Sequence, residues 1–195
     1  MSVNEHCYYK VNIDISNALN PNWRMPLPTG NYGIWAPRAR DIFSQDWLDY
    51  TASLGLHFGH ALLFYRGPNT TSKEAHVDTA ADSKSFIGFA LNWVIGGRNS
   101  HMNWFKMPGL EAATAVKDTT SKVPYTTFQF KDLEYVESCS IFDDITLVRT
   151  DIPHSITMGN EKRWCISARM IKGFDMPWHS AVQYFRTKNL LVERT

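Results

Sequence analysis

From residue 56 onward, the chain alternates between short runs rich in β-branched and aromatic residues and clusters of turn-forming residues. Glycine, proline and asparagine gather at 67–69, 96–99, 108–109 and 159–160. The runs that they help to separate are 56–67, 73–80, 85–97, 100–107, 126–138, 144–157 and 162–171. Such runs predict β-strands. Seven or so short strands restrict the fold to a closed or sandwiched antiparallel β domain.

The other segments of the chain predict elements that support or border the barrel. Residues 8–15 alternate and predict a further strand, whereas 20–38 are rich in proline and glycine and predict an irregular rim or flap. Apolar residues at helical spacing predict one helix over about 39–54, with Gly55 as its stop. The segment 109–124 is looser, and the tail 174–195 is expected to pack across the barrel. We expect one domain over 1–195, with a barrel core at about 56–171.

Composition narrows the function classes. The chain has 195 residues, a formal net charge of +1 and no long basic run, which makes a nucleic-acid partner unlikely and gives no sign of an anionic membrane partner. No stretch is apolar enough for a membrane span or a signal peptide. The cysteines Cys7, Cys139 and Cys165 are odd in number and far apart, so they predict no disulfide framework. We therefore expect a cytoplasmic protein.

Three residues have the pattern of a metal site. His76 and Asp78 are two apart on a predicted strand, so their side chains point to the same face. His154 follows 76 residues later, between apolar residues. Neither the His76-x-Asp78 pattern nor His154 is strong evidence alone. A His-x-Asp occurs often by chance, and a lone histidine among apolar residues is usually a core residue. Together, two histidines and a carboxylate can hold one face of an octahedral iron and leave three positions open.

The strand at 162–171 adds a candidate anion site. Trp164, Ile166 and Ala168 face one way on an extended chain, whereas Arg163, Cys165, Ser167 and Arg169 face the other. Burying an arginine is costly unless an anion pairs with it, and a guanidinium suits a carboxylate. The alternative is an exposed sheet face on which the arginines make salt bridges. The small side chains between the two arginines favour a pocket.

In this order, His76-x-Asp78, His154 and a following arginine resemble the Fe(II)- and 2-oxoglutarate-dependent dioxygenase superfamily, over about residues 60–171. The resemblance implies a double-stranded β-helix, or jelly roll, with one or two supporting helices. It implies Fe(II) bound by His76, Asp78 and His154. It also implies 2-oxoglutarate held by Arg163 as the first candidate anchor, or by Arg169 as the second, with Ser167 in the same pocket.

Two further positions are candidates for contact with 2-oxoglutarate. Several branches of the superfamily have a tyrosine at the place of Tyr65, which can equally be a core or rim residue. Asn92 interrupts an apolar strand, so its amide either faces the cofactor pocket or satisfies backbone groups at a bulge. The histidines His57, His60, His101 and His179 lack suitable spacing and are interpreted as structural or rim residues.

The activity implied by the resemblance is hydroxylation of a peptidyl residue, an amino acid or a small molecule by dioxygen, with formation of succinate and carbon dioxide. Two other classes of protein remain open. A metal-dependent cupin enzyme without 2-oxoglutarate would share the barrel, although such enzymes usually offer three or more histidines and a glutamate. A non-catalytic jelly-roll binding module would make the histidines and the aspartate incidental.

Overall fold

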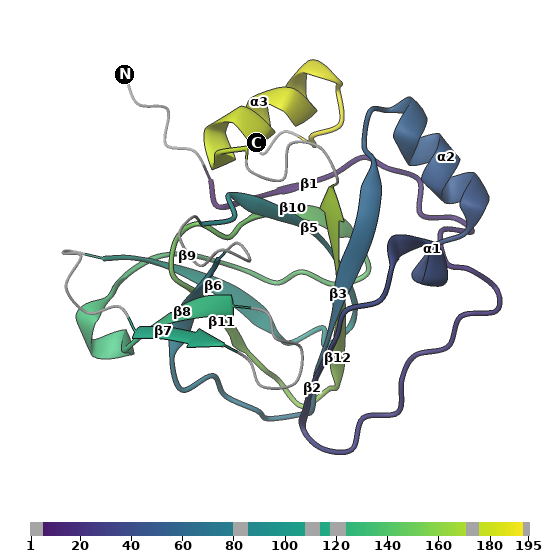
Figure 1. The fold of residues 1–195 in the computed structure, drawn as a ribbon. Helices are drawn as coiled ribbons and strands as arrows, with labels where there is room; N and C mark the ends of the chain where they lie inside the picture. Colours follow the sequence, from purple (N-terminus) through teal and green to yellow (C-terminus); the bar gives the residue numbers. More distant parts are fainter. Residues whose placement is uncertain (1–5, 80–85, 108–113, 118–123, 171–175, 193–195) are drawn as a thin grey trace.

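The computed structural model describes residues 6–79, 86–107, 114–117, 124–170 and 176–192, and within them the protein is a mainly β sandwich of two antiparallel sheets with few helices (Figure 1). The strands are β1 (Tyr8–Lys10), β2 (Tyr32–Trp35), β3 (Phe58–Arg66), β4 (Ala75–Asp78), β5 (Phe89–Gly96), β6 (His101–Lys106), β7 (Thr114–Lys117), β8 (Pro124–Phe128), β9 (Glu134–Cys139), β10 (Ile145–Arg149), β11 (His154–Thr157) and β12 (Arg163–Met170). The helices are α1 (Ala39–Ile42), α2 (Gln45–Ser53), α3 (Trp178–Thr187) and the 3-10 turn η1 (Phe130–Asp132).

Each sheet has six strands. The first sheet has the order β1-β10-β5-β12-β3-β2, and the second has the order β7-β8-β4-β11-β6-β9. All of the strand pairs are antiparallel, and strands that are neighbours in the sequence often lie in different sheets, as β3 and β4 do. The chain therefore crosses repeatedly between the two layers, which brings side chains that are distant in sequence to face one another across the sandwich.

The helices lie on the outer side of the first sheet, as Figure 1 shows for α1, α2 and α3. Leu63, Leu91 and Ile166 from that sheet pack in one buried cluster with Trp47 of α2 and Phe185 of α3. This burial of large apolar side chains is the main stabilising contribution on that side. A second apolar cluster, which includes Val94, Met102, Trp104, Val148 and Ile156, combines residues from both sheets.

Alternation along β12 follows the prediction made from its sequence. Trp164, Ile166 and Ala168 belong to the cluster under the helices, whereas Arg163, Cys165, Ser167 and Arg169 line a cavity on the opposite face of the strand. The two-residue period of a strand thus separates an apolar face from a polar one. The prediction that the polar face borders a pocket is confirmed.

The predicted helix over 39–54 is wrong in one respect, because the structure divides it into α1 and α2. Phe43 and Ser44 have extended backbone between the two helices, and the Ser44 hydroxyl accepts a hydrogen bond from the Trp47 amide at 3.2 Å. This is an N-cap, which starts a new helix. Gly55 follows the end of α2 with a φ of +83°, as expected for a helix stop.

The strands also depart from the predicted runs. The irregular segment 20–38 contains β2, and the predicted strand 8–15 shortens to β1. The run 126–138 divides into β8 and β9 around η1, and 144–157 divides into β10 and β11. Within 109–124 the structure describes β7 and the start of β8 only, so the rest of that looser segment lies outside the described residues. The same holds for residue 171 of the last predicted strand and for 174–175 and 193–195 of the tail.

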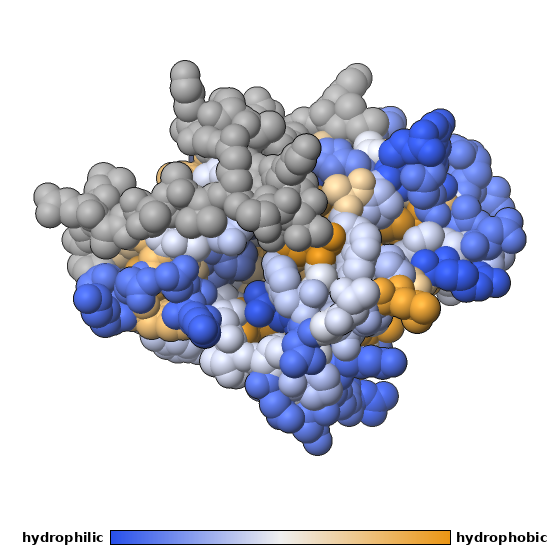
Figure 2. Space-filling model, turned by 60° about the horizontal axis from the view of Figure 1, so that its bottom comes forward, coloured by the Kyte–Doolittle hydropathy of each residue, from blue (hydrophilic) through white to orange (hydrophobic). Residues whose placement is uncertain are grey.

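The helices and the cysteines bear on two further predictions from the sequence. Within the described part of the chain, no helix has the length and apolar character needed to span a bilayer. On the face drawn in Figure 2, the coloured surface is mostly hydrophilic or intermediate, with small hydrophobic patches between. Cys7, Cys139 and Cys165 are free thiols, as the sequence predicts.

Candidate metal centre

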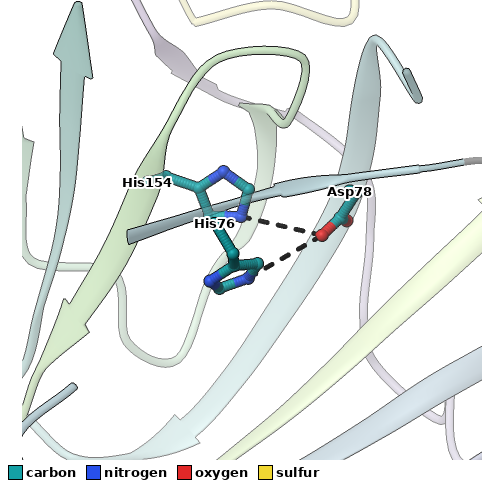
Figure 3. Close-up of side chains that lie close together, drawn as sticks. All are labelled: His76, Asp78 and His154. Carbon is teal, nitrogen blue, oxygen red and sulfur yellow. Dashed lines mark ion pairs between the residues drawn. The ribbon is translucent and has the colours of Figure 1, made fainter. Parts of the chain in front are cut away.

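His76, Asp78 and His154 meet in the interior because β4 and β11 are neighbours in the second sheet. His76 and His154 are directly paired residues of these antiparallel strands, so their side chains stand side by side on one face. Asp78 lies two residues after His76 on β4 and shares that face. Figure 3 shows the three side chains converging from the two strands. The sequence prediction that these three residues come together is confirmed.

The donor atoms lie close enough to share one ion. One potential ligand atom from each of the three residues lies within 4.8 Å of the other two. Oδ1 of Asp78 is 3.8 Å from Nε2 of His76 and 3.8 Å from Nε2 of His154. The two imidazole rings have centroids 4.3 Å apart. Two nitrogen donors and one carboxylate oxygen therefore surround a common space, which is a donor set suited to a divalent transition metal.

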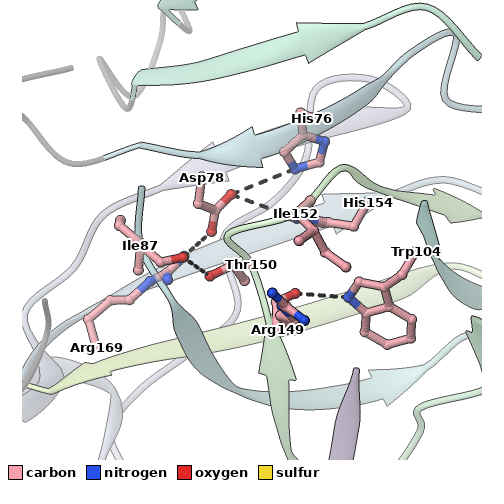
Figure 4. Close-up of polar contacts among 9 residues, drawn as sticks. All are labelled: His76, Asp78, Ile87, Trp104, Arg149, Thr150, Ile152, His154 and Arg169. Atoms are coloured by element: carbon pink, nitrogen blue, oxygen red, sulfur yellow. Dashed lines mark hydrogen bonds and ion pairs between the residues drawn. The ribbon is translucent and has the colours of Figure 1, made fainter. Parts of the chain in front are cut away.

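Outer contacts hold two of the ligands in position. Nδ1 of His154 lies 3.0 Å from the carbonyl oxygen of Ile152, so a proton on Nδ1 is donated there and the Nε2 lone pair faces Asp78. Oδ2 of Asp78 accepts a hydrogen bond of 2.8 Å from Nη2 of Arg169 (Figure 4). That contact leaves Oδ1 toward the imidazoles. Backbone and arginine contacts of this kind typically orient metal ligands.

The electrostatics favour the protonation states that a metal needs. Burial, followed by repulsion from His154, lowers the pKa of His76 to about 3. Burial also lowers the pKa of His154, although Asp78 opposes this shift. For Asp78, burial acts to raise the pKa, but the charges of Arg169 and the two histidines together lower it. At neutral pH the site therefore contains two neutral imidazoles and a carboxylate, which are the ligating forms.

A cavity of about 70 Å³ adjoins the three residues. Its lining includes all four residues of the polar face of β12 together with His76, Asp78 and His154. Asn92 of β5 also lines it, directly paired with Ser167 of β12. Asn92 and Ser167 are 8% and 2% exposed, so both side chains are shielded from bulk water. The structure thus places two of the residues considered for 2-oxoglutarate, Asn92 and Ser167, at the cavity beside the His-Asp-His group.

The two arginines of β12 have different surroundings. Arg169 is bound to Asp78, and its Nε and Nη1 have no hydrogen-bond partner among the described residues. Arg163 is 4% exposed, and no carboxylate in the described ranges lies within ion-pairing distance of it. Gly97 gives Arg163 room, since a Cβ at Gly97 would lie 2.7 Å from the Arg163 Cβ. Arg163 is therefore a buried cation that needs an anion.

Tyr65 was a candidate for contact with 2-oxoglutarate, with a core or rim position as the equal alternative, and the structure places it in the core. It lies on the opposite face of β3 from the cavity beside the His-Asp-His group, where its ring packs against that of Trp164 with centroids 4.8 Å apart. The two-residue period of the strand sends its neighbours Phe64 and Arg66 to the cavity instead. At the end of β3, the strand before the His-x-Asp segment, the residue that faces the cavity is thus Arg66.

The prediction missed Arg66, which lines both the cavity of 70 Å³ and a larger one of about 370 Å³. Five residues line both cavities, so the two are adjacent: Tyr32, Phe64, Arg66, His76 and Asp78. The signal was present in the sequence, because Leu62, Phe64 and Arg66 share one face of a predicted strand and a charged residue there is unusual. We call these spaces the inner and the outer cavity.

The histidines that the sequence prediction set aside do not join the group. Among the described residues, the metal-binding group consists of His76, Asp78 and His154. His57, His60, His101 and His179 are outside it. A comparison with models of known protein families and with curated protein sequences found no match for this chain. The description of the protein therefore stands on its geometry: a β-sandwich whose interior holds a site able to bind a metal ion.

Proposed function

We propose that this protein is an Fe(II)- and 2-oxoglutarate-dependent oxygenase. The observation that supports this most is the combination, around one inner cavity, of a His-Asp-His group and a buried arginine without an acidic partner among the described residues. A metal site alone would fit many enzymes. A metal site beside an unpaired guanidinium favours an anionic co-substrate that spans from one to the other.

The donor set fits Fe(II). Two neutral imidazoles and one carboxylate leave positions for other ligands, as in the oxygenases that bind iron through one face of an octahedron. His76, Asp78 and His154 would hold the ion, with His154 oriented by the Ile152 carbonyl and Asp78 by Arg169. When bound, Fe(II) with 2-oxoglutarate and dioxygen supplies substrate oxidation coupled to formation of succinate and carbon dioxide.

The other residues of the inner cavity fit 2-oxoglutarate. Because Arg169 is engaged with Asp78, Arg163 is the better candidate to bind the carboxylate remote from the metal. The two arginines stand six residues apart, so about 20 Å of strand separates their Cα atoms. Between them, Cys165 and Ser167 are small and leave space on the polar face. Asn92 and Ser167 can donate to or accept from the co-substrate.

We also propose that the sandwich is a jelly roll, as the sequence resemblance implies. Eight strands support this: β3, β12, β5 and β10 are consecutive in the first sheet, and β4, β11, β6 and β9 are consecutive in the second. Followed along the chain, these strands cross between the sheets in two nested sets of hairpins, which is the connectivity of a double Greek key. The metal residues then lie on strands of one sheet, and the anion site lies on the other.

In this proposal the protein binds and orients the metal ion and the co-substrate, and it excludes water from them. The sandwich buries His154 and partly buries His76 and Asp78, and this loss of solvent contact keeps the two imidazoles neutral and ready to bind. Arg163 fixes one end of the co-substrate, so its reactive end is held beside His76 and Asp78. The outer cavity reaches the same two residues, and a substrate bound there would lie beside the metal.

Anaerobic titration of the Fe(II)-loaded protein with 2-oxoglutarate tests the proposal, because chelation to iron produces a weak visible charge-transfer band. We expect the band to saturate in the wild type, to need at least about tenfold more 2-oxoglutarate in Arg163→Met, and to be absent in His154→Ala. Absence of the band in a folded, iron-loaded wild type would contradict the use of 2-oxoglutarate. That result would favour the alternative, a metal-dependent enzyme that does not use 2-oxoglutarate.

A further inference from the structure

The outer cavity is a recess beside the metal residues, large enough for a small molecule. Its volume of about 370 Å³ is at the lower end of the range for small-molecule sites. Residues of β2 and β3 in the first sheet line one side, and residues of β4 and β8 in the second sheet line the other. His76 and Asp78 lie where it meets the inner cavity. A molecule in the recess therefore has direct access to the metal residues.

One wall of the recess is apolar. Ile34 and Leu62 are 7% and 6% exposed, and Phe64 stands between Leu62 and Arg66 on the same face of β3. This wall would bury the hydrocarbon part of a ligand and gain from removing it from water. Aliphatic and aromatic side chains here give shape but no directional contact, so the polar groups of the recess decide the class of ligand.

The polar group with the clearest need for a ligand is Arg66. It is directly paired with Arg163 on one side and with Tyr32 on the other, and its guanidinium carbon lies 5.4 Å from the centre of the Tyr32 ring. No carboxylate within the described segments lies within ion-pairing distance of Arg66. Burial and the charge of Arg163 lower the pKa of Arg66, although Tyr32 opposes this. Two adjacent cations without acids call for anions.

The acidic residues of the recess are already engaged. Asp78 is bound to Arg169, and Glu74 accepts a hydrogen bond from the side-chain amide of Gln129. Lys73 also belongs to the lining, is exposed, and adds a further positive charge to the recess. The recess is therefore apolar on one wall, and at the border between the two cavities it offers a guanidinium that has no acidic partner in the described part of the chain.

On the basis of the proposed function, we propose that the primary substrate is a small molecule with an apolar body and an anionic group, and that Arg66 binds this anion. Arg163 then binds the remote carboxylate of the co-substrate, so each of the two paired arginines has its own anion. The apolar body lies on Ile34, Leu62 and Phe64, with the carbon to be oxidised beside His76 and Asp78. A carboxylate, sulfate or phosphate would satisfy the guanidinium in the same way.

Calorimetric titration with matched probes tests this. The probes are straight-chain carboxylates from butanoate to octanoate, and 4-phenylbutanoate, each compared with its uncharged amide. The protein is loaded with Mn²⁺ and saturated with N-oxalylglycine, an inert mimic of 2-oxoglutarate, so that the inner cavity is filled. In the wild type we expect at least one carboxylate to bind about tenfold or more tightly than its amide. Arg66→Met should remove the preference, and Arg66→Lys should keep part of it.

Two results would overturn the inference. One is a wild type that prefers no carboxylate over its amide. The other is an Arg66→Met variant that keeps the preference but loses N-oxalylglycine binding to the extent that Arg163→Met does, because Arg66 would then belong to the co-substrate site. Thermal unfolding of each variant verifies that it is folded.

Failure of the proposed function is distinguishable from failure of this inference. If N-oxalylglycine does not bind the wild type at all, the same probes are titrated into metal-free Arg163→Met protein, in which Arg66 is the remaining arginine of the pair. A carboxylate preference there supports an anion site at Arg66 without any role for 2-oxoglutarate. Equal binding of carboxylates and amides there refutes it.

Discussion

Nη2 of Arg169 lies 2.8 Å from Oδ2 of Asp78, so the second candidate for the co-substrate anchor is bound to a residue of the His-Asp-His group instead. Under the proposed function, this contact gives the two β12 arginines different roles: Arg169 would orient Asp78, and Arg163 would bind the external anion. The division rests on geometry that the sequence did not contain, since both arginines share one face of one strand.

Replacing Arg169 should weaken metal binding. In Arg169→Met, Asp78 loses the partner that turns Oδ1 toward the imidazoles, so we expect metal affinity to fall by about 10- to 100-fold. Titration with Co²⁺ measures this. The matched control is Arg163→Met on the same strand, in which metal affinity should stay near the wild-type value. Equal losses in the two variants would contradict the division of roles.

A side chain at Gly97 should disturb the anion site and spare the metal. Gly97 has a φ of +65°, and an added Cβ would meet the Arg163 Cβ at 2.7 Å. We expect Gly97→Ala to cost about 1 kcal/mol of stability from its backbone alone and to weaken 2-oxoglutarate binding. Gly30→Ala is the control, because a Cβ there meets nothing within 4 Å. Unchanged 2-oxoglutarate affinity in a folded Gly97→Ala protein would argue against Arg163 as the anchor.

Removal of the Tyr65 hydroxyl should have no effect on co-substrate binding. Tyr65 packs on Trp164 away from the inner cavity, so Tyr65→Phe should leave the dissociation constant of 2-oxoglutarate unchanged. Tyr65→Ala should instead destabilise the fold by about 3–5 kcal/mol, because a large buried ring is lost. A clear loss of 2-oxoglutarate affinity in Tyr65→Phe, measured by the iron charge-transfer titration, would contradict the placement of Tyr65 away from the co-substrate.

The metal-free protein should lose stability as the pH falls below neutrality. The pKa of His76 is about 3 in the folded chain, against an ordinary value of 6.5, so between these values the unfolded chain binds a proton that the folded state does not. The free energy of unfolding should therefore decrease as the pH is lowered through 6.5. Chemical denaturation between about pH 7.5 and pH 5 measures the slope.

The slope has its own control. In His76→Asn it should be smaller than in the wild type, whereas the exposed His57 should contribute little, so His57→Asn should retain the wild-type slope. If His76→Asn and the wild type respond identically to pH, the folded protein does not hold His76 as a neutral imidazole in this pH range.

The sequence predicted those parts of the site that depend on short-range periodicity. His76 and Asp78 share a face because they are two residues apart on a strand, and the four polar residues of β12 share a face for the same reason. The position of His154 beside His76 and Asp78 depends on the strand order, which the sequence does not show. We predicted it because the three residues together make a suitable set of metal ligands. The structure confirms that the three residues lie together.

The prediction failed where the choice depended on a one-residue offset or on tertiary contacts. Tyr65 and Arg66 are adjacent, and only the sheet pairing decides which of them faces inward. The division of the helix at Ser44 depends on a cap and on the packing of Phe43 against Trp47. The engagement of Arg169 by Asp78 joins residues 91 positions apart, and no local pattern contains it.

The central claim is that His76, Asp78 and His154 bind one transition-metal ion together. Metal analysis after loading with Fe(II) or Co²⁺ and anaerobic dialysis tests this most directly, with His101→Ala, a change at an exposed histidine of β6, as the control. We predict about one equivalent of metal in the wild type and in the control, and a large loss in each of His76→Ala, Asp78→Ala and His154→Ala. Full retention of metal by any one of the three folded variants, or a wild type that holds none, would contradict the account.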